Sequence, residues 1–291
     1  MTTPAADTRT DAAQIAANAM GDAPSGWYLY GITRRGPSEE VLGDMDASPL
    51  EGEPLQLLEC GGLAAVVRPV PLAEFNMDVM KERLRDPSKL EAMVRSHNRV
   101  IDTLHARRAI LPAKFGVVYA NVRDIMSALR AGCDTFLPQL HHLEGCDEWA
   151  LHLYADRAVV RDRVAARIPA IARLRDELAA ARPGRAYFLE RQLRDGMESA
   201  TRQALATLAQ GAFDRLVVSV VAGQANRVAR GADASDHVEI LRASFLVARD
   251  RLDRFEAELR AVADASEGLR CECSGPWAPY SFAACSVEGA Q

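Results

Sequence analysis

The sequence predicts an α+β protein of two domains, and three observations lead to this fold class. Short runs of β-branched and aromatic residues alternate with longer segments in which apolar residues recur every three or four positions, as in strands and amphipathic helices. A chain of 291 residues is long enough for two domains of ordinary size. Beyond Gly145 the strands and helices follow a more regular order, so we place the domain boundary at that residue.

The strands of the first domain, residues 26–145, are predicted from β-branched and aromatic composition bounded by turn residues. Gly61 and Gly62 separate two of them and suit the tight turn of a β-hairpin. A short helical stretch is also expected at 72–84. The extended segments expected in this domain are 27–33, 55–59, 63–67 and 110–119.

The clearest helix of the chain is predicted to start at Asp86. Aspartate suits the N-cap because its carboxylate accepts backbone N–H groups, and Pro87 suits the first helical position, where no N–H is needed. Apolar residues then recur at steps of three, four and seven, and the same stripe includes His97. We expect this helix to run to about residue 108.

A second helix is predicted after Asn121, which suits the N-cap. Asp124 lies three residues later, in the capping-box position that Glu or Gln usually holds. Gly145 suits the left-handed cap beyond the end of this helix. Pro138 lies within it, and we expect it to kink or break the helix.

The second domain, residues 146–291, shows the order strand, two helices, strand, strand, helix, strand. This is the order of the split βαβ, or ferredoxin-like, fold with one inserted helix. We therefore expect a modified ferredoxin-like domain whose helices cover one face of its sheet. The segments expected are strand 149–154, helix 156–181 interrupted near Pro169, helix 185–210, strands 216–221 and 240–247, a helix from 250 to 268, and extended chain at 269–273 and 280–287.

The composition excludes several classes of function. With 48% hydrophobic and 26% charged residues, the chain is typical of globular proteins, and its net charge of -5 argues against a nucleic-acid partner. No apolar stretch reaches the roughly 18 residues needed to cross a bilayer. Residues 1–25 lack the apolar core of a signal peptide, so we expect a disordered tail there and a cytoplasmic protein without a membrane partner.

The cysteines give little indication of a metal site. Cys271 and Cys273 are separated by one residue, whereas structural zinc sites need about two to four residues between paired cysteines. Cys285 follows without a second pair. We interpret these cysteines as small buried apolar side chains and expect no metal.

The histidines fall into two groups. His141 and His142 point about 100° apart on a helix, so with Glu144 they are interpreted as a solvated helix end and not as metal ligands. His97 lies on an apolar stripe and allows two interpretations. It is either a buried imidazole bonded to a backbone carbonyl, which we favour, or a pH-sensitive or partner-contacting residue.

No catalytic or cofactor-binding residues can be assigned. The carboxylate pairs Asp147–Glu148 and Glu39–Glu40 show no sign of the different environments that acid–base catalysis needs, so we interpret them as solubilising loop residues. The chain contains no G-x-S-x-G nucleophile elbow, no phosphate-binding loop and no dinucleotide fingerprint. The sequence therefore favours a protein without enzymatic activity and without a cofactor.

The segment at 275–282 has the most unusual local composition. Its prolines hold the chain extended, while Trp277, Tyr280 and Phe282 offer large apolar areas. We favour the interpretation that it is an aromatic plug across the end of the C-terminal sheet. The alternative is a docking surface for another protein, in which these three residues contact the partner.

Blocks of sequence in these segments resemble one known family. They are WYLYGI at 27–32, His97 followed by ILPAKFG at 110–116, LEGCDEW at 143–149, PGRAYFL at 183–189, FLV at 245–247 with Phe255, and GPWAPYSF at 275–282. The chain resembles the gas vesicle protein L/F (GvpL/GvpF) family, whose blocks occur in this order. Departures from the family pattern are mild, such as Ala113 and Lys114 where Leu and Arg are usual, and Ser274 and Ala278 where Thr and Pro are usual.

The resemblance implies an α+β protein with a modified ferredoxin-like second domain and no catalytic residues. It further implies a non-enzymatic accessory or minor structural protein that acts in gas vesicle assembly, in contact with the hydrophobic shell protein and other accessory proteins. Such a shell protein would aggregate in water unless its apolar face were covered. The alternative is a small-molecule-binding regulator or enzyme built on the ferredoxin-like domain. Both the L and the F type remain open.

Overall fold

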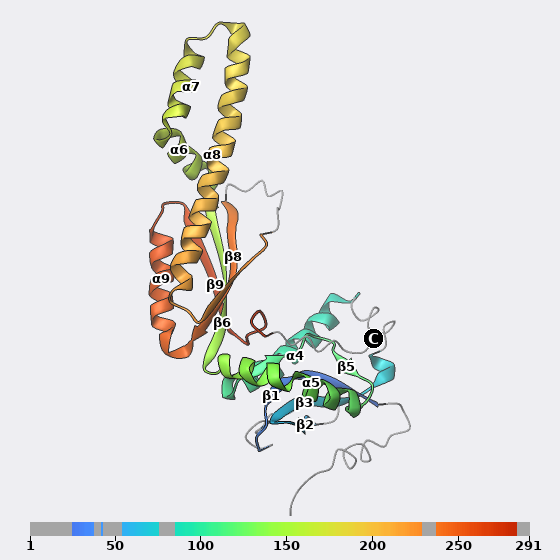
Figure 1. Cartoon of the computed structure of the whole chain (residues 1–291). Helices are drawn as coiled ribbons and strands as arrows, with labels where there is room; N and C mark the ends of the chain where they lie inside the picture. Colours follow the sequence, from blue (N-terminus) through green and yellow to red (C-terminus); the bar gives the residue numbers. More distant parts are fainter. Residues whose placement is uncertain (1–24, 38–41, 43–53, 76–84, 229–236, 284–291) are drawn as a thin grey trace, which may run out of the picture. The chain divides into compact units, whose positions relative to one another are not determined.

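The structure, a computed structural model, describes residues 25–37, 42, 54–75, 85–228 and 237–283 (Figure 1). The chain divides into two compact units. Unit 1 contains the residues up to Gly145 together with those from Trp277 onward, and unit 2 is Cys146–Pro276. The tail expected at 1–25 lies outside the described residues, except for Ser25, which begins the first strand.

Unit 1 is built on a five-stranded antiparallel sheet in the order β2-β3-β1-β4, with β5 also paired to β1. The central strand β1 has eight consecutive buried residues, so both of its faces are covered. The helix α4 contacts β1 and β4, and α5 contacts all five strands. The strands are β1 (Ser25–Arg34), β2 (Gln56–Cys60), β3 (Leu63–Pro71), β4 (Ile110–Pro112) and β5 (Val118–Tyr119).

The predicted hairpin is confirmed. Cys60 pairs with Leu63, and the two residues between them are Gly61 and Gly62, whose φ angles of 59° and 85° are left-handed. A 3-10 turn, η1 (Leu72–Glu74), follows β3. It occupies the start of the helical stretch expected at 72–84, and residues 76–84 lie outside the described part of the chain.

Both predicted helices of unit 1 form, as α4 (Pro87–Arg107) and α5 (Val122–His142). The Asp86 carboxylate accepts the backbone N–H groups at the start of α4, as expected for an N-cap. The Asn121 side chain accepts the N–H of Asp124 at 3.0 Å, and its amide donates to the Asp124 carboxylate at 2.8 Å, so Asp124 bonds the side chain of the N-cap and not its backbone N–H as in a capping box. The predicted caps are therefore confirmed.

The expected break at Pro138 does not occur, because α5 continues to His142. Proline removes only one helical hydrogen bond, and the residues on either side of it hold the helix in place. Phe136 and Leu140 are both buried, so tertiary packing compensates for the lost bond. Gly145 has a φ of 68°, as expected beyond a helix end.

Unit 2 contains a four-stranded sheet in the order β7-β8-β6-β9, in which β8 is antiparallel to both β6 and β7. Its elements are β6 (Cys146–Asp156), α6 (Arg157–Arg167), α7 (Pro169–Ala179), α8 (Pro183–Val217), β7 (Ala222–Asn226), β8 (His237–Ala248), the 3-10 turn η2 (Arg249–Arg251), α9 (Leu252–Asp264) and β9 (Leu269–Trp277). The predicted interruption at Pro169 is confirmed, since α6 ends at Arg167 and α7 begins at the proline.

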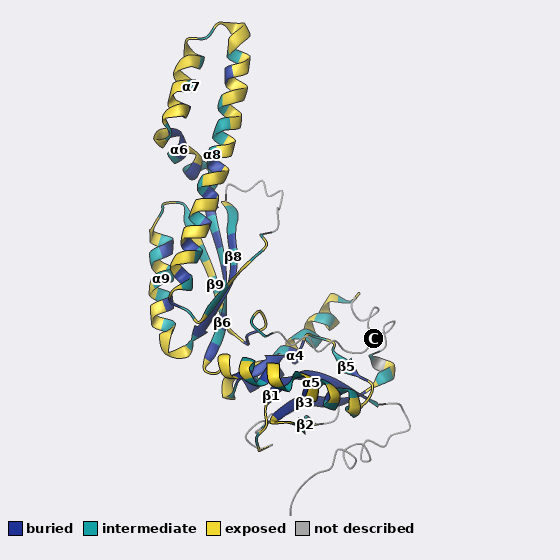
Figure 2. Cartoon of the chain, viewed as in Figure 1, coloured by how far each residue is buried: buried dark blue, intermediate teal, exposed yellow. Residues whose placement is uncertain are grey.

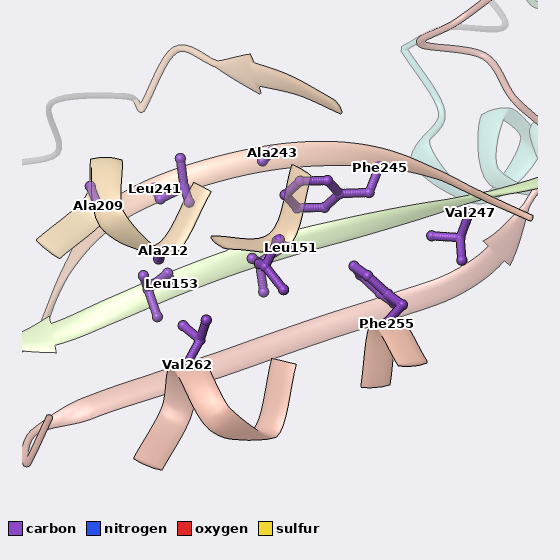
Figure 3. Close-up of a cluster of buried hydrophobic side chains, with 11 residues drawn as sticks. Leu151, Leu153, Ala209, Ala212, Leu241, Ala243, Phe245, Val247, Phe255 and Val262 are labelled. Carbon is purple, nitrogen blue, oxygen red and sulfur yellow. The ribbon is translucent and has the colours of Figure 1, made fainter. Parts of the chain in front are cut away.

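The core of unit 2 lies between one face of the sheet and the helices α8 and α9. Alternate residues of β6 and β8 point to this face, and Figure 3 shows their side chains meeting those of the helices. Phe245 of β8 lies with its ring centroid 5.7 Å from that of Phe255 on α9. The buried cluster is Leu151, Leu153, Ala209, Ala212, Leu216, Leu241, Ala243, Phe245, Val247, Phe255 and Val262.

The strand predicted at 216–221 is wrong. The helix α8 continues to Val217, and β7 begins only at Ala222. The β-branched residues after Leu216 favour a strand locally, but Leu216 itself extends a buried helical stripe at steps of four, three and four from Leu205. Its side chain is fully buried in the core, so packing decides the conformation.

The helices α7 and the first part of α8 form a two-helix arm that extends beyond the sheet of unit 2 (Figure 1). Most of its residues are exposed (Figure 2). Ile171 and Leu189 are buried along the arm, and Gly196 of α8 lies opposite the Ile171 side chain, where a Cβ would make an ordinary van der Waals contact at 3.6 Å. The arm is thus held by a narrow apolar seam.

The end of the chain differs from the expectation in two respects. Residues 277–283 group with unit 1, whereas the expected second domain ran from 146 to 291. The reason is that Ala278 is buried within the apolar cluster of unit 1. The extended chain expected from Tyr280 is a turn instead, because the N–H groups of Phe282 and Ala283 both bond to the Pro279 carbonyl. Residues 284–287 lie outside the described part.

Candidate partner-binding surface

A buried hydrogen-bonded group in unit 1 is centred on His97. Its Nε2 lies 3.1 Å from the carbonyl oxygen of Ala113, which can only accept, so Nε2 carries the proton. Its Nδ1 must then accept, and the Tyr28 hydroxyl donates to it at 2.9 Å. The same hydroxyl accepts the backbone N–H of Gly116 at 3.1 Å. This chain of bonds joins β1, α4 and the loop at 113–116.

The local sequence explains why these groups meet. The stripe of α4 directs His97 toward the sheet, and strand alternation places Tyr28 and Tyr30 on the same face of β1. The imidazole stacks on Tyr30 at 5.6 Å and meets the edge of Phe115 at 5.7 Å. The family blocks around His97 and 110–116 are therefore two halves of one packing arrangement.

Burial sets the ionisation of this group. It lowers the pKa of His97 to about 4, although the bond to the Ala113 carbonyl opposes the shift. It also raises the pKa of Tyr28. His97 is 1% exposed and Tyr28 is fully buried, so a substrate has no direct access to either. The favoured interpretation of His97 as a buried imidazole bonded to a backbone carbonyl is confirmed. The hydrogen bonds of His97 and Tyr28 fix α4 and the loop at 113–116 to β1.

Arg68 is a buried cation that was not expected from the sequence. It lies on β3 with 1% of its surface exposed, and its guanidinium carbon lies 5.7 Å from the centroid of the Tyr30 ring. The one available signal was a single charged residue within the apolar strand at 63–71. Because the Arg68 side chain is enclosed in the interior of unit 1, it is not accessible to a partner protein.

The cysteines of β9 lie on the core side of the unit 2 sheet. Cys271 and Cys273 pack half-buried against the core cluster, which agrees with their interpretation as apolar side chains. Burial raises the pKa of both thiols, that of Cys273 to about 11. Among the described residues no group of three His, Cys, Asp or Glu side chains could hold a metal ion, and Cys285 lies outside that part.

The remaining candidates have ordinary roles. His141 and His142 are exposed at the end of α5, as predicted. Asp147 and Glu148 lie in β6 and not in a loop, and the Asp147 carboxylate accepts two hydrogen bonds from the Arg249 guanidinium at 2.9 and 3.0 Å. The pair Glu39–Glu40 lies outside the described residues.

The surface that remains runs from Trp277, the last residue of β9, to Phe282. Trp277 is 48% exposed and Tyr280 is 38% exposed, while Phe282 is half-buried. The plug interpretation is therefore wrong for Trp277. The buried residues of this segment are Ala278 and Pro279, which anchor it to unit 1, and the Tyr280 hydroxyl donates to the Asn98 side chain at 3.2 Å.

A second exposed aromatic pair was not singled out from the sequence. Tyr187 is 64% exposed and Phe188 is 71% exposed, near the start of α8 on the arm of unit 2. Their rings meet edge to face with centroids 5.8 Å apart. The signal was present in the block at 183–189, where two aromatic residues stand side by side and so cannot both face the seam of a two-helix arm.

In the described part of the chain, none of the helices combines the length and the apolar character that a membrane span requires.

Comparisons with known proteins agree with the resemblance of the sequence blocks. Residues 26–284 match the family described as gas vesicle synthesis protein GvpL/GvpF. Gas vesicle protein L of Streptomyces sp. (strain CB03234) is 32% identical over 274 residues, which cover 90% of this chain and 94% of that protein. Gas vesicle protein F of the same organism is 29% identical, over 88% of this chain and 98% of that protein.

The fold is also found in a solved structure. The crystal structure of gas vesicle protein GvpF from Anabaena sp. PCC7120 matches with a TM-score of 0.69 at 19% sequence identity, and the match covers 90% of this chain and 99% of that chain. At this identity the match speaks for the fold alone. From the sequence match over residues 26–284, the chain belongs to the GvpL/GvpF family of gas vesicle synthesis proteins.

Proposed function

We propose that the chain is a non-enzymatic accessory and minor structural protein of gas vesicles, acting in the cytoplasm and at the vesicle. In this proposal it takes part in assembly by binding the hydrophobic shell protein and other accessory proteins through a surface that includes Trp277, Tyr280 and Phe282. Family membership supports the gas vesicle context. The single observation that supports this binding surface is that Trp277 is 48% exposed although the next residue, Ala278, is buried.

The segment contains both buried residues, which fix its backbone, and exposed aromatic residues, which can contact a partner. Ala278 and Pro279 are buried and fix the backbone, so little backbone freedom would be lost when Trp277 and Tyr280 contact a partner. Aromatic residues on a fixed backbone are the typical centres of binding energy in protein interfaces. An apolar shell subunit offers the complementary surface, since its exposed face would otherwise aggregate in water.

We also propose that unit 2 is a modified ferredoxin-like domain, in which α8 and α9 are the two helices of that fold and α6 and α7 are inserted between β6 and α8. The strand order β7-β8-β6-β9 supports this assignment, because it places the first and third strands of the unit in the centre of the sheet. The contacts of α8 and α9 with the core cluster on one face support it as well.

The test is capture of the shell protein by affinity-tagged full-length chain in cells that express both. We expect Trp277→Ala to melt within a few degrees of wild type, because an exposed side chain contributes little to stability, and to capture much less shell protein. Val218→Ala is the matched control, since Val218 is 72% exposed on another part of the chain. Equal capture by wild type and Trp277→Ala at equal folding would contradict the proposed surface.

A further inference from the structure

The strand β9 is an edge strand of the unit 2 sheet. In the described part of the chain β6 pairs with one side of β9, and no strand pairs with the other. An edge of this kind offers backbone N–H and C=O groups to another chain. None of the nine residues of β9 is buried, whereas the core-facing Leu151 and Leu153 of the neighbouring β6 are fully buried. The core of unit 2 is therefore incompletely covered along this edge.

The charges on β9 are complementary to those of a second copy of the same strand. Arg270 and Glu272 lie on the face opposite to the cysteines, about half exposed, and form an ion pair within the strand. Residues that oppose each other in an antiparallel pair lie on the same face. A strand that presents one positive and one negative charge on one face can therefore meet a second copy of itself with opposite charges facing each other.

We propose that two copies of this chain pair through their β9 strands, antiparallel about Cys271, so that two four-stranded sheets become one continuous sheet. Such a pair is closed by a two-fold axis, the commonest symmetry of soluble oligomers. The half-buried Leu269, Cys271 and Cys273 would then be covered by the same residues of the partner. This pairing is independent of the proposed contact at Trp277.

The charges select this register. A two-fold axis at Arg270 would oppose the two arginines, and an axis at Glu272 would oppose the two glutamates, both of which destabilise a strand pair. An axis at Cys273 would set Arg270 against Pro276, which has no N–H to donate. With the axis at Cys271, Arg270 faces the partner's Glu272, and Glu272 faces the partner's Arg270.

The same register places the two Cys271 residues opposite each other. Directly opposed residues of an antiparallel pair have Cα atoms about 4.5–5.5 Å apart, within the range of about 4.4–6.8 Å that a disulfide spans. Cys273 instead faces the partner's Leu269. Cross-linking through Cys271 and not through Cys273 is therefore specific to the proposed pairing.

The first experiment measures self-association of the full-length chain by sedimentation over increasing concentration. Five paired residues form a small interface, so we expect a weak dimer that forms reversibly at high concentration. Arg270→Glu or Glu272→Arg alone should raise the dissociation constant roughly tenfold, because each creates like-charge pairs at two symmetric positions. The double variant Arg270→Glu/Glu272→Arg should restore wild-type association, because the charges again oppose each other.

A matched control is Asp195→Arg, which makes the same change of charge in the exposed Arg191–Asp195 pair on α8. It should leave association unchanged, and circular dichroism should show every variant folded. A second experiment treats the chain with diamide, which accepts two protons and two electrons from two thiols to become its hydrazine as the disulfide forms. The experiment uses a chain in which Cys60, Cys133, Cys146 and Cys285 are replaced by serine, so that only the two cysteines of β9 can react. This chain and its Cys273→Ser variant should yield a linked dimer, and its Cys271→Ser variant should not.

A chain that stays monomeric at every concentration would overturn the proposal. So would a dimer that is insensitive to Glu272→Arg, or a cross-link that persists in Cys271→Ser.

Discussion

Acidification should weaken unit 1 through His97. The imidazole is 1% exposed and has a pKa of about 4 in the folded chain, compared with 6.5 for a histidine that is exposed to water. Its Nδ1 accepts from Tyr28, so a second proton would both charge a buried ring and break that bond. The unfolded chain has neither constraint and takes up the proton more readily.

The sign and size follow from linkage. Since the folded pKa lies below the unfolded one, stability is complete above about pH 6.5, falls as the pH drops toward about 4, and falls no further below that. Between pH 7 and pH 5, the two pKa values correspond to a loss of about 2 kcal/mol in the free energy of unfolding from this residue alone. That is a large part of the stability of a typical domain, about 5–15 kcal/mol.

The assay compares urea unfolding of wild type and His97→Gln at pH 7 and pH 5. Glutamine can donate to the Ala113 carbonyl and accept from Tyr28 but does not titrate, so its loss of stability over this range should be smaller by about 2 kcal/mol. Trp27 is 5% exposed in β1 and reports on unit 1 when Trp149 and Trp277 are replaced by Phe.

Other groups also titrate in this range, and the comparison between variants removes their contribution. His142→Gln is the matched control, because His142 is exposed at the end of α5 and lies outside the bonded group. It should keep the pH dependence of wild type. Equal losses of stability in wild type and His97→Gln would refute the reasoning, because they would mean that His97 takes up a proton equally well in both states.

Three further predictions concern stability, each measured as the free energy of unfolding. Tyr28→Phe should cost about 1–3 kcal/mol, because it leaves the buried Nδ1 of His97 without its donor, whereas Tyr30→Phe should be near neutral, because the Tyr30 hydroxyl has no hydrogen-bond partner among the described residues. Leu216→Ala should cost about 2–5 kcal/mol and Val218→Ala almost nothing, if α8 ends as described. Gly116→Ala should cost about 1 kcal/mol through its φ of 86° alone, since an added Cβ meets nothing within 4 Å.

Local signals predicted the elements that local chemistry decides. The caps at Asp86 and Asn121 and the glycine turn of the hairpin all formed as expected, because each depends on residues within a few positions. The stripe of α4 also located His97 correctly. Its partners at Tyr28 and Ala113 could not be named, because they lie 69 and 16 residues away and meet it only through the fold.

Errors arose where tertiary packing overrides local preference. The β-branched run after Leu216 favoured a strand, yet the core holds Leu216 in a helix. The aromatic segment around Trp277 was interpreted as buried on composition, although its buried residues are Ala278 and Pro279. Composition reports how much apolar area a segment contains, and not which side chain points inward.

The return of the chain to unit 1 at Trp277 has a consequence for synthesis. Ala278 belongs to the apolar cluster of unit 1, but it is translated only after the whole of Cys146–Pro276. While the ribosome synthesises unit 2, the cluster that contains Tyr28 and Ile101 therefore lacks Ala278. The contiguous unit 2 can complete its own core first, which reverses the N-terminal-first order usual for multidomain chains.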